Sequence, residues 1–163
     1  MINVAVIGTG NISRFHIEGY LKFPERCKIT HLVDMYPDKA EQKKTDYKLP
    51  DARVVTSYKD ILNDPGINLV SIATPPYCHK EIAEAFLLAG KNVIVEKPMA
   101  ASLEECDAMI AASKKERGYP LGYRAKPVPG RHREPQAGGR FGEDRQGYPC
   151  TDRFPLVAGT FLL

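Results

Sequence analysis

A glycine-rich turn near the start of the sequence has the residue types of a phosphate-binding site. Gly8, Thr9 and Gly10, followed by Asn11 and Ile12, lie between an apolar run and an amphipathic stretch. Gly8 would permit a tight turn, and Gly10, which has no Cβ, would let a phosphate approach the backbone. The first amides and the dipole of the following helix would favour negative charge. This pattern predicts a site for the pyrophosphate of a dinucleotide.

An acidic residue, Asp34, ends the second apolar run. At that place a carboxylate can accept both hydroxyls of an adenosine ribose, and its charge repels a 2′-phosphate. The nearest following cation is Lys39, and no arginine is there to offset the charge. We therefore expect NAD as the cofactor, with NADP less favoured. The alternative is that Asp34 only caps the helix expected after Pro37.

A lysine in an EKP tripeptide, Lys97, ends the fifth apolar run, and the fourth run ends in ATPP. The carboxyl ends of parallel strands line the ligand crevice of an open α/β sheet, so both segments should lie near the glycine turn. A partly desolvated ammonium there can hydrogen-bond an oxygen that gains or loses a proton as hydride moves. The alternative is an ordinary solvated surface lysine.

The scaffold for these motifs is an alternation of strands and helices. The expected strands are INVAVIG, KITHLVD, ARVVT, NLVSIAT and NVIVE. Such continuous apolar runs are typical of a parallel sheet covered by helices on both faces. Helices are expected over residues 11–23, from 37 onward, and over 58–63, 79–89 and 102–118. The last begins with a capping box, Ser102 and Glu105. The prediction is an α/β fold, a Rossmann-type doubly wound parallel sheet of about five strands.

The sequence resembles the Gfo/Idh/MocA family, which includes glucose–fructose oxidoreductases and inositol dehydrogenases. The resemblance covers about residues 1–122. It rests on VIGTGNIS, Asp34, SYKDIL, IATPPYCH and, most specifically, VIVEKPMAASLEE. It implies an NAD(P)-dependent dehydrogenase that acts on hydroxyl or carbonyl groups of sugars, polyols or related compounds. The alternative is a non-catalytic nucleotide-binding or sensor module. Such a module would bind NAD equally well but would not need Lys97.

The resemblance also implies residue roles. Lys97 would be the catalytic residue beside the nicotinamide and the substrate. Glu96 and Pro98 would shape the strand end that holds it. His79 is equally well a cofactor contact or a structural residue at a helix start, whereas His16 and His31 are expected to be ordinary helix and strand residues. The expected cofactor-binding residues are Gly8, Thr9, Gly10, Asn11, Ile12, Asp34, Ala73, Thr74, Pro75, His79, Glu96, Lys97 and Pro98.

The segment 123–163 departs from the pattern, being rich in Arg, Gly and Pro. Read one base out of frame, with suitable third-position bases, the stretch from Gly122 gives VIGQNRFPGGIENL, which resembles what the family carries next. Read with the same shift, the later stretches FGEDRQGYPC and PLVAGTFLL give LGKIVKGIH and PWWRGHSY. We therefore expect a frameshift near Gly122 and a largely disordered out-of-frame tail. The sixth strand would then be disrupted, leaving the fifth as an exposed edge prone to association.

The frameshift would also remove the substrate domain and the surface through which this family usually forms homo-oligomers. We therefore expect little turnover. The excess charge of +3 lies in residues 121–163, so a tail that binds nucleic acid is the less favoured alternative. The four cysteines form no CxxC pair, no apolar run has the length of a membrane span, and we expect the N-terminal residues not to act as a leader. We expect a cytoplasmic protein with no metal and no membrane partner.

Overall fold

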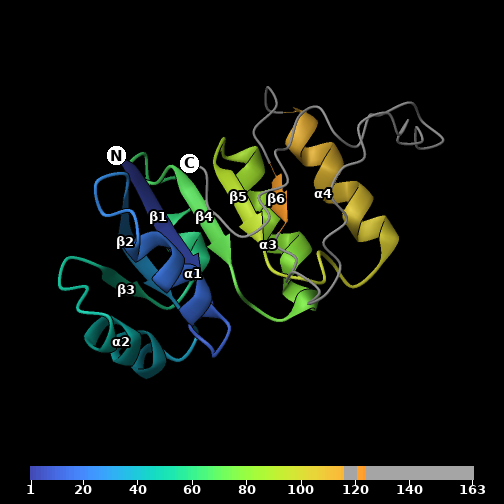
Figure 1. The fold of residues 1–163 in the computed structure, drawn as a ribbon. Coiled ribbons are helices and arrows are strands. Elements are labelled where there is room, and N and C mark those ends of the chain that lie inside the picture. The colour runs from blue at the N-terminus through green and yellow to red at the C-terminus, as the bar shows by residue number, and fades with distance from the viewer. Residues whose placement is uncertain (116–120, 124–163) are drawn as a thin grey trace, which may run out of the picture. The chain divides into compact units, whose positions relative to one another are not determined.

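A computed structural model describes residues 1–115 and 121–123 of the chain, and these residues form one parallel sheet with helices between its strands (Figure 1). The strands are β1 (Ile2–Ile7), β2 (Cys27–Val33), β3 (Arg53–Val55), β4 (Leu69–Ile72), β5 (Asn92–Val95) and β6 (Leu121–Tyr123). The helices are α1 (Ser13–Leu21), α2 (Pro37–Asp46), α3 (His79–Leu88) and α4 (Leu103–Lys115), with 3₁₀ turns η1 (Tyr58–Ile61) and η2 (Pro76–Cys78).

The strand order is β3-β2-β1-β4-β5-β6, and every pair is parallel. This is the order of the Rossmann fold, in which the direction of strand addition reverses between β1 and β4. Ligands of such sheets bind at the carboxyl ends of the strands beside that reversal. The predicted fold class is therefore confirmed, and the glycine turn follows one of the two strands at the reversal.

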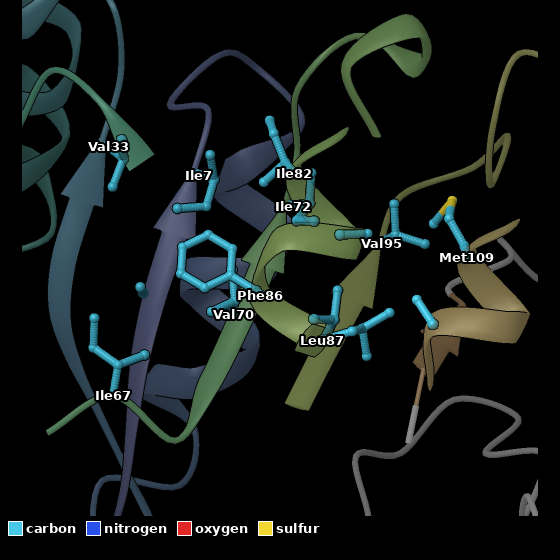
Figure 2. Close-up of a cluster of buried hydrophobic side chains, with 14 of the residues drawn as sticks. Ile7, Val33, Ile67, Val70, Ile72, Ile82, Phe86, Leu87, Val95 and Met109 are labelled. Atoms are coloured by element: carbon cyan, nitrogen blue, oxygen red, sulfur yellow. The ribbon is translucent and has the colours of Figure 1, made fainter. Parts of the chain in front are cut away.

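Helices pack on both faces of the sheet, because successive side chains of a buried strand point to opposite sides. Ile72 of β4 and Val95 of β5 belong to one hydrophobic cluster with Phe86 of α3 and Met109 of α4. Figure 2 shows Phe86 projecting over the strands and Met109 lying beside Val95. Fully burying one such side chain contributes about 1.5–3 kcal/mol. This cluster fixes α3 and α4 on the sheet.

The capping box predicted at the start of α4 forms with one change of partner. The Ser102 hydroxyl accepts a hydrogen bond from the Glu105 amide at 3.2 Å, as expected. The Glu105 carboxylate, however, accepts from the amide of Ala101 at 2.9 Å. The side chain therefore reaches one residue further back than in a standard capping box, and it still satisfies an amide ahead of the helix.

The expectation that β5 would be an exposed edge needs correction. Leu121–Tyr123 pairs in parallel with Val93–Val95, so β5 lies between β4 and β6. The expected open edge on β5, and the association it would cause, therefore lose their basis. Strand pairing needs only backbone amides and carbonyls. Three residues can therefore pair although the residues after them do not have the pattern of a strand. Beyond Tyr123, the expected out-of-frame tail lies outside the described residues.

Within residues 1–115 and 121–123, no helix has the length and apolar character needed to cross a membrane.

Candidate cofactor-binding site

The turn between β1 and α1 requires glycine at its first position. Gly8 has a φ of +86°, in the region that residues with a Cβ rarely adopt. A Cβ added there would lie 2.9 Å from both the carbonyl carbon and oxygen of Ala73, at the end of β4. The Gly8 amide donates to the Val33 carbonyl oxygen at 2.7 Å. Gly8 therefore holds the turn tightly between the ends of β2 and β4.

The second glycine faces open space. A Cβ built on Gly10 would meet nothing within 4 Å, and the residue is exposed. Behind it, the buried Ser13 hydroxyl donates to the Gly10 carbonyl oxygen at 2.7 Å, which fixes the turn to the first residue of α1. The amides of Asn11 and Ile12 donate to no other group in the part of the chain that is described. Open space beside free amides at a helix start suits an approaching phosphate.

Asp34 is joined to this turn directly. Its Oδ2 accepts hydrogen bonds from the Thr9 amide and the Thr9 hydroxyl, each at 2.8 Å. Its Oδ1 accepts from the Tyr36 amide at 3.0 Å. The carboxylate is therefore fixed at the end of β2, beside the glycine turn, with lone pairs left for further donors.

These contacts also bear on the charge of Asp34 and on its alternative role. Burial acts to raise the pKa of Asp34, but the hydrogen bonds from Tyr36 and Thr9, with the nearby charge of Lys39, outweigh it and lower the pKa. The group is therefore ionised at neutral pH. The residue preceding α2 is Tyr36, which makes no side-chain capping bond. Because Asp34 also binds Thr9, helix capping alone does not account for its position.

A hollow of about 520 Å³ lies beside Asp34's partner Thr9, between the glycine turn and α2. Its lining residues are Thr9, Gly10, Asn11, Asp38, Lys39, Gln42, Lys43 and Asp46. The wall formed by α2 carries two lysines and two carboxylates, so it has no strong net charge. We call this space the α2 hollow.

The loop after β4 presents one polar atom without a partner. The hydroxyl oxygen of Thr74 is buried, and it makes no hydrogen bond to any described residue. Leaving such an atom unpaired costs about 1–3 kcal/mol, so unpaired buried hydroxyls are rare away from ligand sites. Ala73 is buried and Pro75 is exposed on either side of it. Thr74 therefore has the capacity to bind a polar group of a ligand in the crevice.

His79, at the start of α3, joins the two loops of the crevice from behind. Its side chain is fully buried. Nε2 lies 2.8 Å from the Thr74 carbonyl oxygen, and Nδ1 lies 3.0 Å from that of Pro98 and 3.2 Å from that of Met99. Of the two roles expected for His79, the structural role at a helix start is observed. Direct contact of His79 with a cofactor stays a prediction.

Glu96, which is nearly buried, is held by His16, and the expectation that His16 is an ordinary helix residue needs correction. Its Oε1 lies 2.9 Å from His16 Nε2, and its Oε2 accepts the Lys97 amide at 3.0 Å. The other ring nitrogen, His16 Nδ1, lies 2.6 Å from the Ser71 hydroxyl. The missed signal was a histidine on the buried face of α1, beside Ile17 and three residues after Ser13. A buried histidine on such a face requires polar partners.

The Lys97 side chain is exposed, and Pro98 beside it is exposed too. The expected partial desolvation of the ammonium is therefore not found, because nothing in the described ranges covers it. The Lys97–Pro98 peptide bond is cis. What the structure does fix is the backbone of Lys97, through the bond from its amide to Glu96.

The described residues fit a dinucleotide. The Gly10 turn is open where a phosphate would lie, the ionised Asp34 stands next to it, and the Thr74 hydroxyl lacks a partner. The glycine turn and the ATPP and EKP segments all follow the carboxyl ends of adjacent strands, β1, β4 and β5. The predicted residues are thus brought to one edge of the sheet, although Glu96 and His79 lie beneath its surface.

Known proteins with the same pattern support this assignment. The model of the family described as "Oxidoreductase family, NAD-binding Rossmann fold" matches residues 2–120. The inositol 2-dehydrogenase of Serratia proteamaculans is 29% identical over 170 residues, covering 98% of this chain and 48% of that protein. The scyllo-inositol 2-dehydrogenase (NADP(+)) of Bacillus subtilis is 41% identical over 112 residues, covering 69% and 30%.

A solved structure shows the same fold. The WlbA dehydrogenase of Bordetella pertussis, in complex with NADH and UDP-GlcNAcA, superposes with a TM-score of 0.69 at 27% identity. The match covers 76% of this chain and 34% of that one. The chain thus spans less than half the length of these relatives. With the glycine turn, the acidic end of β2 and the EKP strand end all in place, the chain belongs to the Gfo/Idh/MocA oxidoreductase family, whose NAD-binding Rossmann domain it contains.

Proposed function

We propose that this chain binds NAD for an oxidoreductase that transfers hydride to or from a hydroxyl or carbonyl group of a sugar, polyol or related compound. The observation that carries the proposal is the pair of hydrogen bonds that the Thr9 amide and hydroxyl donate to Asp34, beside the open turn at Gly10. It prepares a negative group for the ribose and leaves space for the pyrophosphate. The names of the relatives, which include two inositol dehydrogenases, support the substrate class.

The adenosine end of the cofactor would lie in the α2 hollow. Asp34, whose partner Thr9 lines the hollow, would accept the ribose hydroxyls and repel a 2′-phosphate, so we expect NAD to bind more tightly than NADP. Lys39 and Lys43 also line the hollow, but Asp38 and Asp46 balance their charge. One relative bears NADP(+) in its name, so this preference needs its own test.

Lys97 would act at the other end of the cofactor. The bound nicotinamide supplies or accepts the hydride. The Lys97 ammonium would then donate a hydrogen bond to the substrate oxygen and stabilise negative charge on it as its proton moves. Because Lys97 is exposed, a bound substrate or a further part of the protein would have to desolvate it. The described crevice offers no partner acid or base, so we expect the chain to bind NADH with little turnover.

The direct test is calorimetric titration of the folded 163-residue chain with NADH and with NADPH. NADH should bind more tightly. Asp34→Asn should weaken NADH binding about tenfold, since one charge-assisted bond to the ribose is worth roughly 1.5 kcal/mol. The matched control is Asp51→Asn, an exposed carboxylate paired with Lys28 at 2.9 Å and outside the crevice. A folded chain that gives no heat with NADH would contradict the proposal.

A further inference from the structure

A buried chain of hydrogen bonds runs through the sheet to Lys97. Ser71 of β4, His16 of α1 and Glu96 at the end of β5 are 0%, 0% and 6% exposed. The Ser71 hydroxyl lies 2.6 Å from His16 Nδ1, and His16 Nε2 lies 2.9 Å from Glu96 Oε1. The second carboxylate oxygen of Glu96 accepts the Lys97 amide at 3.0 Å. Three elements of the fold are thus joined to one peptide group.

The contact with Glu96 requires a proton on one particular nitrogen of the His16 ring. Nε2–H of His16 donates to the Glu96 carboxylate, which only accepts when ionised. Nδ1 lies within hydrogen-bond distance of the Ser71 hydroxyl, which can either donate to it or accept from it. The carboxylate uses its other oxygen for the Lys97 amide. Because Ser71 is fully buried, its hydroxyl is closed to substrate, and the arrangement serves to hold groups in place.

We propose that His16 is a positioning residue for Lys97, acting through the Glu96 carboxylate. Without His16, Glu96 would have a free oxygen in a nearly dry site and would rotate toward water, releasing the Lys97 amide. The helix that carries His16 begins at the glycine turn, so the same element fixes the expected pyrophosphate site and the strand end of Lys97. The spacing between cofactor and lysine is thereby set by one rigid helix.

The alternative is that His16 only stabilises the core. Removing any buried hydrogen-bonded histidine costs stability, so loss of stability alone does not distinguish the two roles. The distinguishing feature is local: the positioning role predicts a change at the Lys97 amide that exceeds the change elsewhere in the sheet. Gln in place of His16 offers an N–H donor at the position of Nε2, whereas Leu offers none.

The first measurement uses the unmodified chain. Long-range proton–nitrogen NMR of the histidine rings should show that Nε2 of His16 carries a proton. The Lys97 amide should exchange slowly with solvent although its side chain is exposed. A His16 ring protonated on Nδ1 and bare on Nε2 would overturn the proposal without any variant, so the test survives if a substitution prevents folding.

The second measurement compares variants by amide hydrogen exchange, with the Val6 amide in the centre of the sheet as the internal reference. His16→Leu should speed exchange at Lys97 about tenfold or more relative to Val6, the loss expected for one bond to a charged group. His16→Gln should restore most of the protection. His31→Leu, at another buried histidine, is the matched control and should leave the Lys97 ratio unchanged. An unchanged ratio in His16→Leu, or no rescue by Gln, would overturn the proposal.

The inference rests on the proposed function only for its consequence in hydride transfer. Neither measurement contains a cofactor, so failure of NADH binding and failure of the His16 contact are seen separately. If the chain binds NADH, His16→Leu should lower the affinity less than Asp34→Asn does, because His16 would act on Lys97 and not on the ribose.

Discussion

The two halves of the crevice are held in place by different means. Around the glycine turn, the backbone does the positioning: Gly8 has a positive φ, and Asp34 is bound by two backbone amides as well as one hydroxyl. Around the EKP segment, two fully buried histidine side chains do it, with His16 holding Glu96 and His79 holding the loop carbonyls.

This difference separates binding from stability. Gly10 and Asp34 are at least partly open to solvent, so altering them should act mainly on the ligand. His16 and His79 are removed from solvent, and any change leaves buried polar groups without partners. Changes on the histidine side should therefore be seen in the free energy of unfolding even when no cofactor is present.

The largest expected effect is an exception, because it is a loss of stability caused by a substitution in the glycine turn. Gly8→Ala should lower the free energy of unfolding by about 4 kcal/mol, from the strain of the positive φ and from a Cβ that meets rigid backbone. Urea denaturation followed by circular dichroism measures this. The control is Gly10→Ala, whose Cβ meets nothing within 4 Å.

For Gly10→Ala, the unfolding midpoint should stay close to that of the unmodified chain while NADH affinity falls. A methyl group there would occupy the space proposed for the pyrophosphate. Equal destabilisation by the two substitutions would remove the distinction between a packed and an open glycine. Undiminished NADH affinity in Gly10→Ala would place the cofactor elsewhere.

The next effect tests the histidine side. His79→Leu should lower the free energy of unfolding by about 2–3 kcal/mol, because it removes the ring contacts to carbonyl oxygens of both crevice loops and leaves at least one of these oxygens without a donor. Lys80→Ala, on the next residue of α3, is the control. It removes only a 3.6 Å ion pair with Glu84 and should cost about 0.5 kcal/mol or less. Similar losses in the two variants would mean that the His79 contacts add little.

The smallest effect concerns pH and a third buried histidine outside the crevice. Burial lowers the pKa of His31, with Asp64 acting to raise it and Arg53 to lower it further. The unfolded state therefore takes up a proton near the usual pKa of 6.5, at a pH where the folded state does not. The free energy of unfolding should fall as the pH drops through that value.

His31→Leu removes this contribution, so its free energy of unfolding should depend less on pH between about 7.5 and about 5.5. Urea titrations of both chains at the two ends of this range give the comparison. Parallel pH profiles for the two chains would show that His31 contributes nothing to the slope.

Much of the fold could be predicted from the residues alone. The five continuous apolar runs became β1 to β5, and the tight turn expected after the first run forms at Gly8. The exposed edge expected on β5 was the error, because Leu121–Tyr123 pairs with it through backbone groups, which a break in the side-chain pattern does not prevent. The exposure of Lys97 also differed from expectation, since burial depends on what covers a residue and not on its neighbours in sequence.

The sequence by itself determined the parallel sheet, the glycine turn and the edge at which the motif residues meet, because these follow from local periodicity and backbone geometry. The tertiary structure alone decided that His16, 55 residues from Ser71 and 80 from Glu96, would join them. The reason is physical: a buried polar side chain must find donors and acceptors in space, and distance along the chain does not determine which ones lie within reach.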